Sequence, residues 1–304
     1  MRIVFMGTPV FAVPTLRALA QEHEVPLVVT RPDAVRGRGR KLVPSPVKEA
    51  ALEHGIPVLE TNRITSEVLE AVRTSSPDLI AVAAYGCILP DELLELAPLG
   101  CVNVHASLLP RWRGAAPIQR AVLEGDERAG VSIMQVVHEL DAGAYCRQAS
   151  VEVGSKDCAT VMAELADLGA QELLLAIPTF ADKTVVWQEQ DESQVTYAHK
   201  IEKQEMLLDP LDSAQTNVRR VRASLDAAPA RLVVAGKGVR ILAAHVASQE
   251  MEQGAVEVRK GHVTMGCPQG SFEVERVKPD GKREMDASAW ASGLRGNGLV
   301  WERA

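Results

Sequence analysis

A chain of 304 residues is long for one compact core and suits two domains. Its 46% hydrophobic and 24% charged residues argue against disorder, and its longest apolar runs, such as residues 79–89, are too short to span a bilayer. The five cysteines are odd in number and form no C-x-x-C pair, which argues against a zinc site or disulfide framework and, with no secretory signal, favours the cytoplasm.

The net charge of −7 is unevenly distributed. Residues 209–304 hold 14 basic and 12 acidic residues, so residues 1–208 carry a balance of −9. The segment 31–48 nevertheless has six basic residues and one acidic residue. Because salt screens distant charges beyond about 10 Å, this segment can still bind phosphates.

Strand and helix patterns alternate in the first half of the chain. Strands are predicted within 2–7, 24–32, 56–60, 78–86 and 100–110, and helices within 8–22, 45–55, 66–77 and 115–125. Ser45 is the expected N-cap of the second helix, with Pro46 at its first position. Repeated β-α units with short connections predict a doubly wound α/β domain with a Rossmann-like parallel sheet.

The turn Gly7-Thr8-Pro9 follows the first strand, where a dinucleotide-binding fold has G-x-G-x-x-G. The later glycines are missing and Pro9 lacks an N–H. We therefore expect a structural turn and no bound dinucleotide.

After a strand at 131–143 and a long amphipathic helix at 159–180, the composition changes. Residues 187–205 are polar and predict a linker between a catalytic domain at 1–186 and a second domain at 206–304. Short strands separated by Gly, Pro and Asp-Gly turns predict that the second domain is a smaller OB-like β-barrel.

Three polar residues alternate along the strand at 100–110. Asn103, His105 and Ser107 are expected on one face, with Val102, Val104 and Ala106 on the other. Ligands of open α/β sheets bind at the carboxyl ends of the strands. The alternative is structural: Asn103 caps the strand, His105 is a core histidine, and Asp141 stabilises its turn.

The chemistry available to such a group is acyl transfer without a covalent intermediate. Asn103 and His105 can donate hydrogen bonds to the oxyanion that forms when an amine attacks a carbonyl carbon. Asp141, in the turn after the next strand, is the best candidate to orient the imidazole.

The segment from Asn103 to Gln135 resembles the methionyl-tRNA formyltransferases, within the folate-dependent formyltransferase family. This resemblance implies a formyltransferase domain followed by an OB-like tRNA-binding domain. It implies 10-formyltetrahydrofolate as co-substrate, no metal, and methionyl-initiator tRNA as acceptor for translation initiation. The matching catalytic positions are Asn103, His105 and Asp141, and the folate-binding positions are Ser107, Leu108, Leu109, Pro110, Tyr85, Gly86, Ile88 and Leu89.

The tRNA-specific branch is favoured by three segments that resemble it: residues 2–16, the basic segment 31–48, and residues 190–201 with Tyr197 and Lys200. The resemblance implies that the basic loop enters the acceptor stem. Gly37 and Gly39 leave the loop free to adapt. The expected tRNA-binding residues are Arg36, Arg38, Arg40 and Lys41.

Two other functions share parts of this pattern. A sugar-nucleotide formyltransferase or a formyltetrahydrofolate hydrolase would keep the central residues but would not need the basic loop. A non-catalytic tRNA-binding module would need the loop and not the central residues. One active site per chain makes a monomer sufficient.

Overall fold

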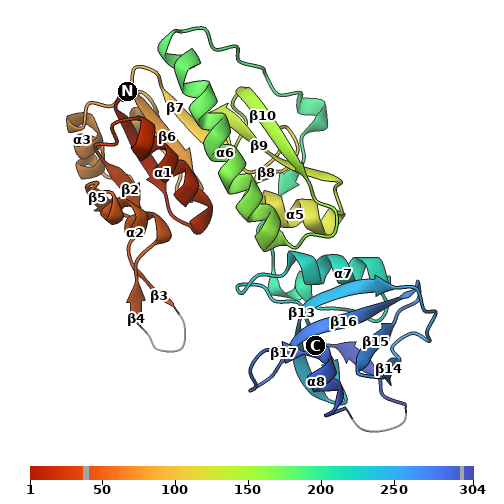
Figure 1. Cartoon of the computed structure of the whole chain (residues 1–304). Helices are drawn as coiled ribbons and strands as arrows, with labels where there is room; N and C mark the ends of the chain where they lie inside the picture. The colour runs from red at the N-terminus through yellow and green to blue at the C-terminus, as the bar shows by residue number, and fades with distance from the viewer. Residues whose placement is uncertain (37–40, 295–297) are drawn as a thin grey trace. The chain divides into compact units, whose positions relative to one another are not determined.

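The computed structural model describes residues 1–36, 41–294 and 298–304, without the side chains of residues 36 and 41. The chain divides into two compact units (Figure 1). The first unit contains Met1–Pro117, Arg128–Glu152 and Val161–His199, and the second contains Ile118–Glu127, Val153–Thr160 and Lys200–Ala304. Of the predicted linker 187–205, residues 187–199 therefore belong to the first unit.

A seven-stranded sheet forms the centre of the first unit, in the order β10-β9-β7-β6-β1-β2-β5. Its strands are β1 (Ile3–Gly7), β2 (Val28–Thr30), β5 (Val58–Glu60), β6 (Leu79–Ala83), β7 (Cys101–His105), β9 (Arg128–Gln135) and β10 (Tyr145–Glu152). β5, β2, β1, β6 and β7 run parallel to their neighbours. β1 and β6 are buried along their whole length, as expected for central parallel strands.

Two strands depart from the predicted parallel arrangement. β9 pairs antiparallel with β7, and β10 pairs antiparallel with β9. The chain passes from β9 to β10 through the short loop 136–144, which contains no crossover helix and can join only antiparallel neighbours. The Rossmann-like parallel sheet is confirmed, with this antiparallel edge added to it.

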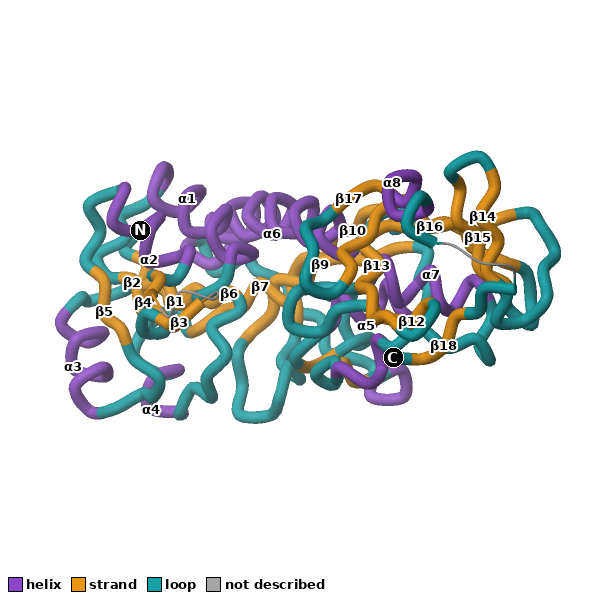
Figure 2. Tube along the Cα trace, turned by 90° about the horizontal axis from the view of Figure 1, so that it is seen from below, coloured by secondary structure: helices purple, strands orange, loops and turns teal. Residues whose placement is uncertain are grey.

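Helices cover both faces of the sheet. They are α1 (Val13–Glu22), α2 (Pro46–Glu53), α3 (Ser66–Thr74), α4 (Asp91–Leu94) and α6 (Cys158–Ala181), with a short 3-10 turn η1 (Val10–Ala12) before α1. A further helix, α5 (Pro117–Glu124), belongs to the second unit except for Pro117. α1 and α6 lie on one side of the sheet, and α3 and α4 on the other (Figure 2). The Ser45 cap of α2 is confirmed, since its side chain accepts a hydrogen bond from the Lys48 backbone.

Small elements surround this sheet. β3 (Ala34–Arg36) and β4 (Lys41–Val43) form an antiparallel hairpin that projects from the first unit (Figure 1). β8 (Arg113–Gly114) pairs in parallel with β11 (Tyr197–Ala198), which follows the 3-10 turn η2 (Glu192–Gln194). Two residues of the segment 187–199, Tyr197 and Ala198, are therefore hydrogen-bonded into the first unit as a short strand.

The second unit is built on an antiparallel sheet that curls into a half-barrel, which confirms the smaller OB-like domain. Its strands are β12 (Arg231–Val234), β13 (Lys237–Ala247), β14 (Val256–Arg259), β15 (His262–Gly266), β16 (Ser271–Pro279), β17 (Met285–Asp286) and β18 (Trp301–Arg303). Its other elements are the helices α7 (Ala214–Ala223) and α8 (Ala287–Ala291) and the 3-10 turn η3 (Lys203–Met206). Phe272 and Trp301 pack edge to face in its core, with ring centroids 5.6 Å apart.

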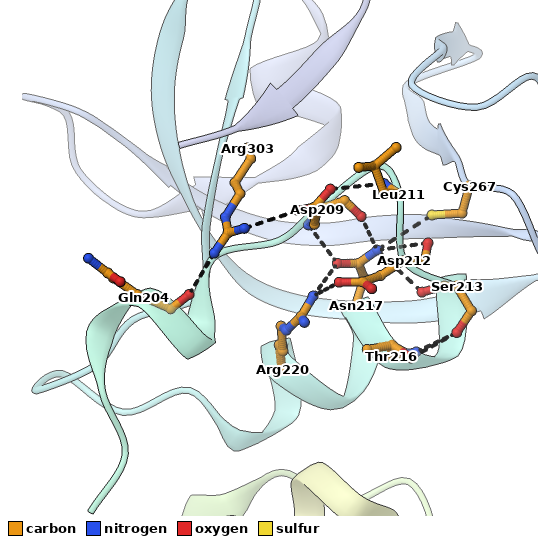
Figure 3. Close-up of polar contacts among 10 residues, drawn as sticks. All are labelled: Gln204, Asp209, Leu211, Asp212, Ser213, Thr216, Asn217, Arg220, Cys267 and Arg303. Atoms are coloured by element: carbon orange, nitrogen blue, oxygen red, sulfur yellow. Dashed lines mark hydrogen bonds and ion pairs between the residues drawn. The ribbon is translucent and has the colours of Figure 1, made fainter.

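A buried asparagine joins α7 to the loop that precedes it (Figure 3). Asn217 is fully buried, and its amide nitrogen donates to the backbone oxygens of Asp209 and Ser213 at 2.9 and 3.2 Å. Its amide oxygen accepts from the Asp209 backbone at 3.0 Å. One side chain thus bonds backbone groups at both ends of the loop from Asp209 to Ser213.

No helix in the described part of the chain is long and apolar enough to cross a membrane.

Candidate active site

β7 brings Asn103 and His105 to the carboxyl edge of the parallel strands. Asn103 pairs in register with Val82 of β6 and with Met134 of β9. α6 packs on the opposite face, where Gly169 lies against the Val104 side chain. The predicted alternation is therefore confirmed for these two residues. The alternation does not extend to Ser107, because β7 ends at His105 and Ser107 lies in the following turn.

The Asn103 side chain is half-buried, and no hydrogen bond to it is found within the residues that the structure describes. An amide in this state keeps both of its donors for a ligand.

His105 is almost fully buried and held through one ring nitrogen. Its Nε2 lies 3.0 Å from the backbone oxygen of Trp112. A carbonyl oxygen only accepts, so Nε2 carries a proton and donates it. Any further proton that His105 gains or gives up must therefore be at Nδ1.

Asp141 faces that second nitrogen. Its Oδ2 lies 3.7 Å from His105 Nδ1 and accepts a hydrogen bond from the Gly114 backbone at 2.8 Å. The carboxylate is only 17% exposed, and Asp141 has a positive φ of 49°. The structure thus brings Asn103, His105 and Asp141 to one place from β7 and from the β9–β10 loop.

The turn after β7 is held by one of its own side chains and by side chains of β9 and β10. Ser107 Oγ donates to the Arg111 backbone at 2.6 Å, and the Ser107 carbonyl accepts from Ser132 at 2.6 Å. Gln148 donates to the Leu109 carbonyl at 2.8 Å, and the Leu109–Pro110 bond is cis. Ser107 and Leu109 are buried, whereas Leu108 and Pro110 are partly exposed.

The segment after β6 forms a second wall at the same edge. Tyr85 and Leu89 are buried in the core beneath α3 and α4, whereas Ile88 is 88% exposed. Gly86 has a positive φ of 77°, and its carbonyl accepts a hydrogen bond from the Arg31 guanidinium. Burial raises the pKa of the Tyr85 phenol to about 12, and nearby Cys87 adds to this shift while Arg31 opposes it.

The residues that follow this segment lie close to the β9–β10 loop. Asp91 Oδ1 lies 3.6 Å from His138 Nδ1. Large apolar side chains are exposed on both segments: Ile88 at 88%, Leu140 at 65% and Val137 at 41%.

A buried polar network lies behind Asp141, and the sequence alone did not reveal it. Gln190 donates to the backbone oxygens of Asp141 and Gly143, both at 2.8 Å. Arg113 is 3% exposed and donates to Gln190 at 2.9 Å and to Glu192 at 2.7 Å. Arg113 lies in the segment that resembles the family, and this was the sequence signal for the network. Gln190 gave no signal, because it lies in a polar stretch without periodicity.

The basic segment is described only in part. Arg36 and Lys41 are paired across the β3–β4 hairpin, and Arg38 and Arg40 lie outside the described residues. At the base of the hairpin, Lys48 Nζ contacts Asp33 at 2.7 Å and Glu60 at 2.9 Å. The hydrogen bond from Lys48 lowers the pKa of Asp33, and the same contact raises the pKa of Lys48.

Among the residues that the structure covers, no group of three or more His, Cys, Asp or Glu side chains is arranged to hold a metal ion.

Comparison with known proteins shows what this chain is similar to. Residues 1–177 match the family described as "Formyl transferase", and residues 200–295 match "Formyl transferase, C-terminal domain". The methionyl-tRNA formyltransferase of Methylococcus capsulatus is 46% identical over 292 residues, covering 94% of this chain and 95% of that protein. The enzyme of the same name from Methylobacillus flagellatus is 42% identical, covering 96% of each chain.

Solved structures share the fold. HypX from Aquifex aeolicus, in complex with tetrahydrofolic acid, aligns with a TM-score of 0.66 at 18% identity, covering 95% of this chain and 46% of HypX. The methionyl-tRNA formyltransferase of Clostridium thermocellum aligns with a TM-score of 0.58 at 14% identity, covering 82% of this chain and 95% of that one.

Proposed function

The chain belongs to the formyl transferase family, and from this membership we propose that it formylates methionyl-initiator tRNA for translation initiation, with 10-formyltetrahydrofolate as the donor. The observation that carries the proposal is the 42–46% identity to methionyl-tRNA formyltransferases over both domains. The cluster of Asn103, His105 and Asp141 supports it, because these groups suit acyl transfer to an amine.

In the proposed reaction, the neutral amino group of the aminoacyl ester attacks the formyl carbon of the donor. A new C–N bond forms, and the carbonyl oxygen becomes an oxyanion. The bond from carbon to N10 of the folate then breaks. The amine loses one proton and the departing nitrogen gains one, so tetrahydrofolate leaves in its neutral form.

Asn103 supplies the permanent donor for this oxyanion. Its half-buried amide does not titrate and has no hydrogen-bond partner in the described part of the chain. Preorganised donors of this kind stabilise a tetrahedral intermediate by a few kcal/mol, equivalent to about 100-fold or more in rate.

His105 and Asp141 handle the proton. Because Nε2 donates to the Trp112 carbonyl, the proton taken from the amine is received or relayed at Nδ1. A protonated Nδ1 faces the Asp141 carboxylate, which stabilises the positive ring. That ring adds a positive charge beside the oxyanion.

The folate site is assigned to the two walls at the carboxyl edge of the sheet. The pterin ring of the donor would lie between the segment Tyr85–Leu89 and the turn Ser107–Pro110. Exposed Ile88 and Leu140 provide apolar surface for it. The basic residues Arg36, Arg38, Arg40 and Lys41 are assigned to the acceptor stem, where guanidinium and ammonium groups meet phosphates and base edges.

The test is formylation of methionyl-initiator tRNA by the purified protein with 10-formyltetrahydrofolate. Elongator methionyl-tRNA and an amino-sugar nucleotide serve as alternative acceptors. Preference for the initiator tRNA supports the proposal, and preference for the sugar nucleotide overturns it. We propose that the protein acts in the cytoplasm and as a monomer. Light scattering of the purified protein checks the monomeric state.

A further inference from the structure

The segment 187–199 contacts the framework of both His105 and Asp141. Its polar composition is typical of a linker, but it belongs to the same compact unit as these residues. Gln188 exchanges two backbone hydrogen bonds with Tyr145, at 2.8 and 3.0 Å, and β11 pairs with β8. Two of its side chains, Gln190 and Thr196, turn inward between these anchors.

Gln190 holds the backbone of the loop that carries Asp141. It is 8% exposed, and its amide nitrogen donates to the carbonyls of Asp141 and Gly143. Both amide hydrogens are thus used on the two sides of Ala142. Asp141 has a positive φ, a conformation that a non-glycine residue keeps only when its surroundings impose it.

Arg113 determines which way the Gln190 amide points. Its Nε donates to Gln190 Oε1 at 2.9 Å, and an arginine can only donate. The amide oxygen must therefore face Arg113, and the NH₂ group must face the two carbonyls. Glu192 balances the buried charge of Arg113 by accepting from its guanidinium at 2.7 Å.

Thr196 acts on the other member of the pair. Its hydroxyl accepts a hydrogen bond from the Trp112 backbone at 3.0 Å. Trp112 also has a positive φ, of 65°, and its carbonyl accepts the Nε2–H of His105. Thr196 thus holds the backbone of Trp112, the residue whose carbonyl selects the ring tautomer of His105.

The pairing of β8 with β11 completes the arrangement. Ala115 and Ala116 donate to the Ala198 carbonyl at 2.8 and 3.2 Å. This pairing places Gly114, whose backbone N–H donates to Asp141 Oδ2. A side chain at Gly114 would lie 2.9 Å from the Ala198 carbonyl, so the close approach requires glycine.

We propose that Gln190 and Thr196 are positioning residues for formyl transfer, Gln190 acting through Asp141 and Thr196 through His105. This inference rests on the proposed function, because that function gives the two acceptor residues their roles. The side-chain contacts of Gln190 and Thr196 that carry this proposal are with the protein, and neither residue is assigned a contact with the substrates. Their loss therefore lowers kcat and leaves the KM values for the folate and the tRNA unchanged.

The first experiment compares matched pairs of variants in the full-length protein. Gln190→Ala is paired with Gln188→Ala, an exposed glutamine whose pairing with Tyr145 uses only the backbone. Thr196→Val, which keeps the shape and loses the acceptor, is paired with Thr196→Ser, which restores it. Gln190→Ala and Thr196→Val should lower kcat by about 10- to 100-fold, because small misplacements of reacting groups have effects of that size. Equal kcat within either pair overturns the proposal.

A double-mutant cycle distinguishes positioning from general destabilisation. If Gln190 acts through Asp141, then Gln190→Ala should cause no further loss of kcat in an Asp141→Asn background. A role confined to folding would reduce activity by the same factor in both backgrounds. That multiplicative result would overturn the assignment of Gln190.

A third measurement needs no substrate. In protein labelled with ¹⁵N at histidine, the ring signals of His105 are assigned by their loss in His105→Gln. The wild-type spectrum should show the Nε2–H form, Thr196→Val should shift it, and Thr196→Ser should restore it. An unchanged spectrum in Thr196→Val overturns the inference even if tRNA formylation succeeds. A failure of the wild-type protein to formylate tRNA would instead overturn the proposed function.

Discussion

His105 Nδ1 and Asp141 Oδ2 lie 3.7 Å apart, slightly farther than a direct hydrogen bond allows. Each atom is fixed from its other side, the ring by the Trp112 carbonyl and the carboxylate by the Gly114 N–H. The pair is therefore held by backbone groups, and Nδ1 is the ring nitrogen that faces the carboxylate.

Substitution at the pair and at the neighbouring amide tests this arrangement. We expect Asn103→Ala and Asp141→Ala each to lower turnover about 100-fold or more, because each removes a group that acts on the developing charge. The measurement is kcat at saturating folate and tRNA. Turnover close to that of the unsubstituted protein in either variant would refute the assigned roles.

Neutralising the basic segment 31–48 should affect tRNA binding and leave the chemistry unchanged. Replacing Arg36, Arg38 and Arg40 by alanine should lower kcat/KM for methionyl-tRNA and flatten its dependence on salt, by about one unit of slope for each lost phosphate contact. Activity on a minimal amine acceptor should stay the same. Arg73→Ala, an exposed arginine on α3, is the control. Equal losses on both acceptors would contradict the assignment.

The buried Tyr85 phenol should make stability fall at high pH. Its pKa is about 12 in the folded protein, against 10.0 for an ordinary tyrosine. Between these values the unfolded chain loses the proton while the folded protein keeps it, so stability decreases as the pH rises through that window. Below pH 10 the phenol is protonated in both the folded and the unfolded protein, so it adds no pH dependence to the free energy of unfolding.

This effect can be followed by the ultraviolet absorbance of phenolate and by urea unfolding, each compared with Tyr85→Phe. The variant should lack both the late titration and the associated loss of stability. A phenolate signal from Tyr85 near pH 10 in the folded protein would show that burial does not protect it.

Loss of the Asn217 side chain should destabilise the second unit. Asn217→Ala leaves the Asp209 N–H without its acceptor and removes a second hydrogen bond from the Asp209 and Ser213 carbonyls, which keep their backbone donors. The loss should cost about 2 kcal/mol in free energy of unfolding, most of it from the unpaired N–H. Gln215→Ala removes an exposed amide from the same helix and should change it little. Equal unfolding midpoints for the two variants would show that the buried bonds contribute little.

Local signals made much of the fold predictable. Ser45 followed by Pro46 is a capping pattern read within four residues, and the structure contains that cap. The alternation of Asn103 and His105 depends only on strand geometry. The apolar runs at β1 and β6 indicated buried parallel strands, and both are buried throughout.

The rest depends on contacts between distant parts of the chain. Gln190 lies 49 residues from Asp141 in sequence, and nothing in its neighbourhood distinguishes it from a solvated residue. The direction of β9 depends on which strand it pairs with, and the pattern of apolar residues does not encode that choice. Ser107 was expected in the strand, but β7 ends two residues earlier.

The contacts of buried Arg113 also determine whether a shortened chain would be stable. A protease nick or a shortened gene product that ends near residue 186 would keep every strand of the seven-stranded sheet and every helix that covers it. It would still lose Gln190 and Glu192, the acceptors of a guanidinium that is 3% exposed. It would also lose β11, the partner strand of β8, which carries Arg113. Such a fragment would retain the outline of the catalytic fold and should aggregate or be degraded.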